Sequence, residues 1–160
     1  MYSAFLLIHS ILRWAVILTG LFAVARAIGG VTGRKPWSRA DDSSGRWFSI
    51  AVDLQFLIGL TLYLALSPFI RDAWADIGAT MRNAPLRFFV VEHVFGMIVA
   101  LGFVHVGRVK IRRATVAAQR HKTAAVFFGV ALVVLLLSIP WPGTPGGRPL
   151  FRGFSSATTI

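Results

Sequence analysis

The sequence contains no cysteine and only 6 acidic residues, against 17 lysines and arginines. Without cysteine the chain cannot form disulfides, thiolate metal sites, iron–sulfur clusters or haem linkages through cysteine. Any metal or cofactor must therefore be held by histidine, carboxylate or thioether groups. The sequence also has no phosphate-binding glycine loop, no His-Glu-x-x-His zinc motif and no nucleophile elbow. These absences exclude the enzyme classes that depend on such motifs.

Apolar residues dominate what is present: 56% of the chain is hydrophobic and the mean hydropathy is +0.69. Runs of about 20 apolar residues are long enough to cross a hydrocarbon core of about 30 Å. We therefore predict an all-α integral membrane protein, a single up-down four-helix bundle over residues 1–160. The start "MYSAFLLIHSILRW" is expected to be a retained first span and not a cleaved signal. The predicted spans are 4–28, 47–69, 86–107 and 123–140.

The net charge of +11 is concentrated just beyond the ends of these spans. The first and third connections carry most of the lysines and arginines, and the second is partly neutralised by aspartates. The positive-inside rule then places the first and third connections in the cytoplasm and both termini on the outer side. We expect these basic segments to set the topology and to contact lipid headgroups, and we expect no nucleic acid partner.

The four histidines fall into two pairs by predicted depth. His9 and His93 both lie a short distance below the outer surface, on the first and third spans. His105 follows His93 by twelve residues, which places it about 18 Å deeper at 1.5 Å per residue. His121 opens the fourth span on the same inner side.

Facing histidines in a helical bundle are typical ligands of haem. Neutral imidazoles from two spans can hold the iron of a b-type haem from both faces. We predict one haem b between His9 and His93. A second haem would need His105 and His121, but His105 is rotated by about 120° from His93 on an ideal helix. His121 lies in "AAQRHKTAA", a setting typical of a solvated interface residue.

Two arginines are candidates for binding the haem propionates. Arg13 follows His9 by four residues, so it lies on the same face of its helix. Arg87, at the start of the third span, is the second candidate. The alternative is that Arg13 extends to lipid phosphate or pairs with Glu92.

Two acids are candidates for a proton or quinone site. Glu92 could exchange a proton with a quinol near the outer surface, or it could form a salt bridge with Arg13 or Arg87. Asp53 could join His105 or carry protons. Small residues on the third span, Gly96 and Gly102, suit either the approach of a flat macrocycle or helix–helix contact.

Several segments resemble one family of small bacterial membrane proteins. "LLIHSILRW", "DLQFLIGLTLY", "RFFVVEH" and the ending "IPWPGTPGGRPLFR" are similar to a four-span family called cytochrome b-like, common in Bacteroidetes and their relatives. The likeness extends from His9 to Arg152. It implies haem ligation by His9 and His93 and a location in the bacterial inner membrane. Some relatives have histidine where this chain has Asp53, so the second span is an alternative source of a ligand.

The predicted function is that of a membrane b-type cytochrome that transfers single electrons. Its partner would be quinone or a larger respiratory or photosynthetic complex, and any enzymatic role would be that of a quinone-linked oxidoreductase. One alternative is a haem-free accessory subunit whose histidines only form hydrogen bonds. Another is a proton or small-solute carrier that uses Asp53, Glu92 and the histidines as a relay. The carrier is disfavoured because no span is clearly broken midway.

Overall fold

The computed structural model describes residues 1–144 and 146–150. These residues form helices and no strand, which confirms the all-α prediction; the last ten residues of the predicted domain, 151–160, lie outside the described part. Each predicted span falls on one long helical segment, but the second and third segments each include a π-helical stretch, and the last helix ends at Leu137, before the predicted end at residue 140. The elements are α1 (Tyr2–Thr32), α2 (Arg39–Thr61), η1 (Leu62–Leu66), α3 (Pro68–Ala75), α4 (Ile77–Arg82), α5 (Ala84–Arg87), η2 (Phe88–Glu92), α6 (His93–Arg113) and α7 (Ala117–Leu137).

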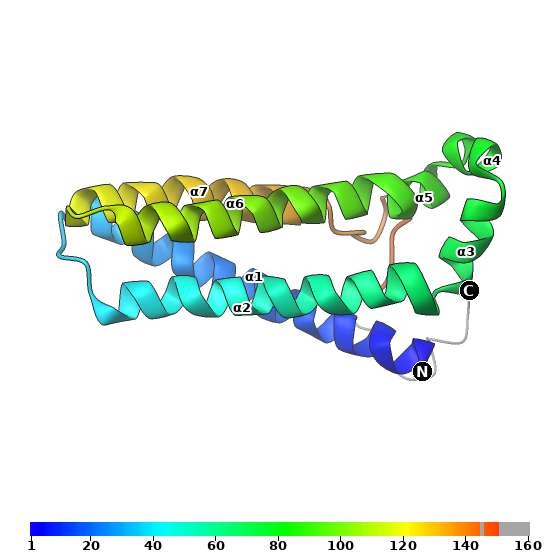
Figure 1. Ribbon diagram of the computed structural model, residues 1–160, viewed down its shortest axis with the longest axis horizontal. Helices are drawn as coiled ribbons and strands as arrows, with labels where there is room; N and C mark the ends of the chain where they lie inside the picture. The colour runs from blue at the N-terminus through cyan, green and yellow to red at the C-terminus, as the bar shows by residue number, and fades with distance from the viewer. Residues whose placement is uncertain (145, 151–160) are drawn as a thin grey trace.

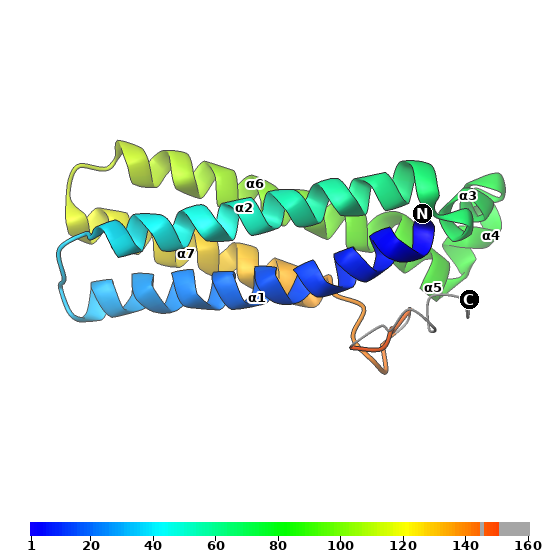
Figure 2. The same cartoon turned by 90° about the horizontal axis from the view of Figure 1, so that it is seen from below.

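The long helices run up and down beside one another (Figures 1 and 2). Helix α1 packs against α2 and α7, and α6 packs against α7, while the fourth neighbouring pair, α2 and α6, packs more loosely. Four helical segments of the described chain are long and apolar enough to cross a membrane, counting η1 with α2, and counting α5 and η2 with α6. We call the end with the connections 33–38 and 114–116 the basic end. The opposite end, with the N-terminus, α3 to α5 and residues 138–150, is the cavity end.

Local sequence signals set the helix boundaries. Helix α2 begins with a capping box, in which Ser38 accepts from the Asp41 backbone and Asp41 accepts the Ser38 backbone N–H at 2.8 Å. Such reciprocal caps satisfy donors that the first helical turn leaves unpaired. At the cavity end Ser67 caps α3, with Pro68 in the first turn, where its missing N–H has no cost.

The half of the bundle towards the basic end contains the tightest core. The rings of Phe48 and Phe128 meet edge to face at 5.6 Å, and both are fully buried. Arg108 is also buried and bonds Asp42 of α2 at 3.1 Å. It therefore joins α6 to α2 inside the bundle, although it lies just beyond residue 107, where the predicted third span ends. Gly45 is needed here, because a Cβ would lie 2.9 Å from Phe128.

Candidate functional site

Two π-helical segments face each other at the cavity end. The η1 segment ends α2, and η2 leads directly into α6 at His93. A π turn widens the helix and interrupts its regular hydrogen bonds, and such turns are frequent at functional sites. The Tyr63 hydroxyl of η1 donates to the Val90 carbonyl of η2 at 2.9 Å. Tyr63 thus ties together the two irregular segments next to His93.

His9 and His93 meet across the bundle from α1 and α6. Their ring centroids are 6.3 Å apart and their planes are inclined by 74°. Two imidazoles bound to one metal at about 2 Å per nitrogen have centroids about 6 Å apart, so the observed separation suits a shared metal ion. Each ring rotates about its own metal–nitrogen bond, so the angle between the planes does not oppose ligation.

The protonation of His93 is set by a bond to α7. Its Nδ1 lies 2.7 Å from the Ser138 carbonyl, which can only accept, so Nδ1 carries the proton and the neutral ring has its lone pair on Nε2. Metal-binding histidines commonly donate their other nitrogen to a carbonyl in this way. Gly96 permits the contact, because a Cβ there would lie 1.9 Å from Ser138 Oγ. Gly96 therefore serves helix–helix contact, whereas Gly102 faces open space.

His9 lacks a complete set of partners. Its Nε2 lies 3.3 Å from the amide nitrogen of Gln55, while its Nδ1 and the Gln55 Oε1 are buried with no hydrogen-bond partner among the described residues. As placed, the Gln55 NH2 group donates to Nε2, so Nδ1 of the neutral ring carries the proton. With the amide reversed, the Gln55 oxygen accepts from Nε2–H, and the lone pair of His9 lies on Nδ1. Gly59 makes room for the ring, because a Cβ there would lie 2.9 Å from His9 Cε1. Buried polar atoms almost always have partners in native proteins, so the unpartnered Nδ1 is a candidate contact for a ligand in the adjoining cavity.

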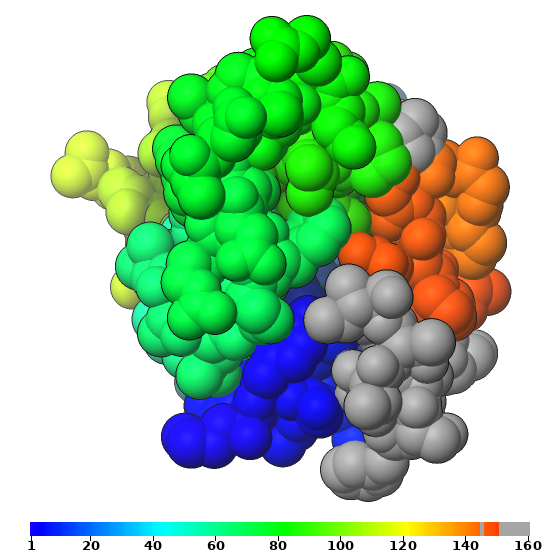
Figure 3. Space-filling view, turned by 90° about the vertical axis from the view of Figure 1, so that its right-hand side faces the viewer, coloured from blue at the N-terminus to red at the C-terminus, as the bar shows by residue number. Residues whose placement is uncertain are grey.

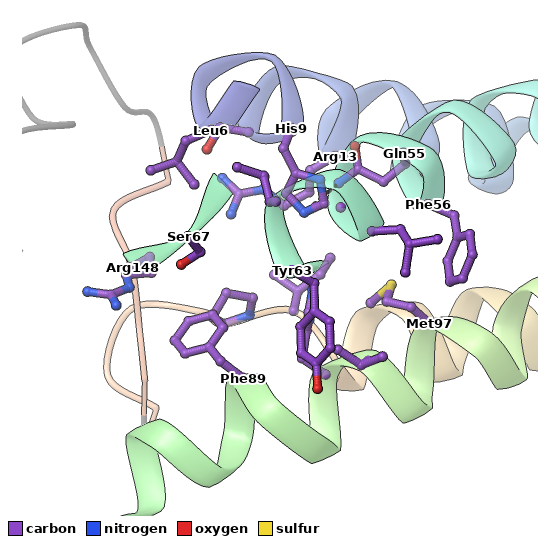
Figure 4. Close-up of a pocket in the computed structure, with 18 of the residues that line it drawn as sticks. Leu6, His9, Arg13, Gln55, Phe56, Tyr63, Ser67, Phe89, Met97 and Arg148 are labelled. Carbon is purple, nitrogen blue, oxygen red and sulfur yellow. Dashed lines mark hydrogen bonds between the residues drawn. The ribbon is translucent and has the colours of Figure 1, made fainter. Parts of the chain in front are cut away.

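Both histidines line a cavity between all four long helices. Figure 4 shows His9 in this cavity beside Arg13 and Gln55. The cavity volume is ≈ 200 Å³. Helices α3 to α5 and the N-terminal turns of α1 lie at this end of the molecule, which faces the viewer in Figure 3. The walls are mainly apolar, as suits an apolar cofactor or ligand. Wall residues include Leu6, Val16, Val52, Phe56, Phe89, Met97 and Leu135.

Two arginines also line this cavity. Arg13 is buried, donates to the Leu150 carbonyl, and lies 5.5 Å from the ring of Trp14. Arg148 was not identified from the sequence. Its guanidinium lies 5.7 Å from the Phe69 ring and 5.2 Å from the Phe89 ring. Arg148 follows a glycine pair in an irregular tail, where no helical periodicity predicts its position; its charge, which it shares with Arg152 of the same tail, is the only signal.

Arg87 and Glu92 pair with each other away from this cavity. Arg87 Nε bonds Glu92 Oε1 at 2.8 Å, and its Nη1 bonds the Met81 carbonyl at 3.3 Å. The salt-bridge alternative for Glu92 is therefore confirmed, with Arg87 as the partner. Arg87 lines a separate surface groove with Trp141, so its predicted role towards propionates finds no support in its position.

Asp53 and His105 join α2 to α6, as the sequence suggested. His105 Nε2 and Asp53 Oδ1 are 2.7 Å apart, and both side chains are about half exposed. His121 has different neighbours, Trp37 at 4.8 Å between ring centroids and Gly30 of α1. The structure thus gives His105 and His121 no shared partner, and the second haem stays a prediction.

The expectation that His121 is solvated is wrong. Only 1% of its surface is exposed, and neither ring nitrogen has a hydrogen-bond partner among the described residues. The reason is its register: α7 begins at Ala117, so His121 lies one turn inside the helix and faces α1. The basic neighbours that suggested exposure lie on other faces of that turn.

Fold and site together define a class: a four-helix bundle, apolar enough to cross a membrane, with two histidines facing each other in a cavity at one end. Across the described residues no group of three or more His, Cys, Asp or Glu side chains is placed to hold a metal ion. In comparisons with known proteins, no family model, no curated protein and no solved structure matches the chain.

Proposed function

We propose that this protein is a membrane b-type cytochrome that binds one haem b between His9 and His93 and transfers single electrons. The haem would supply one-electron redox chemistry, with a membrane quinone or a larger respiratory or photosynthetic complex as partner. The basic end would face the cytoplasm, which places the cavity end and both termini outside. This arrangement suits a bacterial inner membrane, as the family resemblance implies.

The facing pair of imidazoles carries the proposal. Their 6.3 Å separation suits a shared iron, and the Ser138 carbonyl leaves the lone pair of neutral His93 on Nε2. On the other helix, His9 Nδ1 has no hydrogen-bond partner among the described residues, and with the Gln55 amide reversed its lone pair would be available to the iron. The apolar walls would cover the macrocycle, while Arg13 and Arg148 would offer positive charge to the propionates.

The cavity volume sets a condition on this proposal. At ≈ 200 Å³ the cavity is smaller than the ~300–1,000 Å³ of typical small-molecule pockets. Side chains that line the cavity must move apart to admit a macrocycle. The weak packing between α2 and α6 makes that side of the bundle the easiest to open.

The test is the visible spectrum of the purified protein. We expect a reducible Soret band with sharp α and β bands, and we expect His9→Ala and His93→Ala each to abolish them. His105→Ala is the matched control, because it removes a histidine outside the cavity; it should retain the full haem content. A loss of half the haem in His105→Ala would instead support the second pair. A folded but colourless wild-type protein would refute the proposal.

The haem-free accessory subunit is the second candidate. The specific observation in its favour is that each cavity histidine already contacts another helix, His93 through Ser138 and His9 through Gln55. In that case the histidines would lock the bundle, and the protein would be colourless but would purify with a larger complex. The carrier has less support, because Glu92 is already tied to Arg87.

A further inference from the structure

The surface groove that Arg87 lines lies at the cavity end of α6 and α7, two helices that pack side by side. Arg87 is one residue inside the predicted start of the third span, at 86, and Ile139 is one residue inside the predicted end of the fourth, at 140. The groove therefore lies at the boundary between hydrocarbon and headgroups. Trp141 also lines it, and tryptophan is enriched at this depth of a membrane.

Apolar side chains form most of the groove and continue from it into the membrane. The apolar wall residues are Ala84, Phe88, Leu136, Leu137, Ile139 and Trp141. One turn deeper, Phe95 of α6 and Val133 of α7 are 67% and 56% exposed. Phe95 lies three residues after Glu92, and Val133 lies four residues before Leu137, so each continues a helix face that begins at the groove. The groove thus joins the headgroup boundary to an apolar surface along which an acyl chain can lie.

A single ion pair supplies the charges of the described residues that line the groove. Arg87 donates from Nε to Glu92 Oε1 at 2.8 Å and from Nη1 to the Met81 carbonyl at 3.3 Å. These bonds leave Arg87 Nη2 and Glu92 Oε2 without a protein partner in the described part of the chain. The two side chains are 41% and 50% exposed, respectively. The groove therefore offers a cationic donor and an anionic acceptor next to each other.

We propose that this groove binds one phospholipid whose headgroup carries both a phosphate and a primary ammonium, as phosphatidylethanolamine does. Arg87 Nη2 donates to a phosphate oxygen, and the ammonium donates to Glu92 Oε2. The short ethanolamine link holds the two headgroup charges close together, which matches the spacing of a salt-bridged pair. One acyl chain then runs from the groove towards Phe95 and Val133. The site is independent of the proposed haem.

Charge balance and hydrogen bonding select this headgroup among membrane lipids. The groove carries one positive and one negative charge, so an anionic headgroup such as phosphatidylglycerol would meet the Glu92 carboxylate as a like charge. A choline headgroup is zwitterionic, but its quaternary ammonium has no N–H to donate to the carboxylate, which can only accept. A quinone ring carries neither charge and leaves the ion pair without complementary groups.

Photo-crosslinking of the full-length protein in phosphatidylcholine vesicles tests this site. The probe is phosphatidylethanolamine with a diazirine in one acyl chain, present as a minor component. We expect adducts on the two segments that form the groove and its apolar extension, 84–95 and 133–144, as mapped by mass spectrometry. Unlabelled phosphatidylethanolamine should suppress these adducts. The same amount of phosphatidylglycerol with the same acyl chains should suppress them far less.

Neutralising either charge should lower the adduct yield about tenfold, the change expected when one hydrogen bond between charged groups is lost. The variants are Arg87→Gln and Glu92→Gln, and the second should keep the fold because the pair is exposed. In Glu92→Gln the Arg87 charge is no longer balanced, so phosphatidylglycerol should compete better than in wild type; a purely structural role of the pair does not predict this change. Matched controls are Arg46→Gln and Asp53→Asn, each of which neutralises one member of an exposed pair outside the groove. Both should give the wild-type yield.

Three results would overturn the proposal. Adduct yields that Arg87→Gln and Glu92→Gln leave unchanged would show that the ion pair does not hold the headgroup. Equal suppression by phosphatidylglycerol in wild type would show that the ammonium is not recognised. Quantitative disulfide cross-linking between copies of Leu137→Cys, unaffected by phosphatidylethanolamine, would show that a second copy of the chain covers the groove. The haem spectrum is recorded on the same preparations, so a colourless protein refutes the cytochrome while the adducts still decide the lipid site.

Discussion

The two halves of the bundle are built from the same four helices but are packed differently. Towards the basic end, Phe48 and Phe128 fill the centre. Towards the cavity end, α2 and α6 pass into π-helical segments and the helices enclose a cavity lined by His9 and His93. One half is therefore a close-packed core, and the other has space and irregular backbone where a ligand would sit.

Each half also buries a histidine whose ring lacks partners among the described residues. His121 has two such nitrogens and is packed against Trp37, and His9 has one and lines the cavity. An unpaired buried imidazole is therefore not sufficient evidence of a site. The second histidine, the cavity and the Ser138 bond to His93 distinguish the cavity end.

Truncating one phenylalanine in each half should give the largest difference in unfolding free energy between the two halves. Phe128→Ala removes a fully buried ring from the close-packed half, and we expect a loss of about 3–5 kcal/mol in unfolding free energy. Phe56→Ala removes a ring from the cavity wall, which already adjoins open space, and should cost clearly less. Unfolding in mixed micelles measures both. Equal losses would mean that the two halves do not differ in packing.

Adding one methyl group at a glycine in each half tests the same difference in packing, but by adding side-chain volume instead of removing it. In Gly30→Ala the new Cβ would lie 2.1 Å from Nδ1 of His121, whose side chain is fully buried. We expect a loss of about 2 kcal/mol from overpacking. In Gly59→Ala the Cβ would lie 2.9 Å from His9 Cε1, but His9 can move towards the cavity. That variant should be nearly as stable as wild type yet bind haem less well, as thermal unfolding and the Soret absorbance would show.

The sequence predicted the fold well because apolar runs and charge clusters reflect the membrane directly. It also paired His9 with His93, since both lie at one depth on spans that run in the same direction. It misplaced His121, because local charge does not reveal which face of α7 meets α1. It missed Arg148, whose position depends on an irregular tail that returns to the cavity. The π-helical segments depend on tertiary contacts such as Tyr63 to Val90 and leave no pattern in the sequence.

Breaking an ion pair should destabilise the protein more at the basic end than at the cavity end, which is the same direction as the difference in packing. Asp42→Asn leaves the buried Arg108 without its carboxylate, and we expect a loss of about 1–3 kcal/mol because a buried charged donor loses its partner. Glu92→Gln breaks an exposed pair with Arg87, which should cost at most about 1 kcal/mol. The same micelle titration compares the two. A larger loss for Glu92→Gln would contradict the expectation that a buried ion pair in the close-packed half matters more than an exposed pair at the cavity end.

The smallest effect should come from the bond between the π-helical segments. Tyr63→Phe removes the hydroxyl that donates to Val90, and we expect a loss of about 1 kcal/mol because a partly buried carbonyl loses its partner. Hydrogen exchange should show faster amide exchange around residues 90–94, with Phe128 and its neighbours unchanged. Tyr2→Phe removes the only other tyrosine hydroxyl of the chain and serves as the control. Faster exchange at both ends of the bundle would mean that Tyr63 supports the whole fold; a change confined to the start of α6 would show that it positions His93.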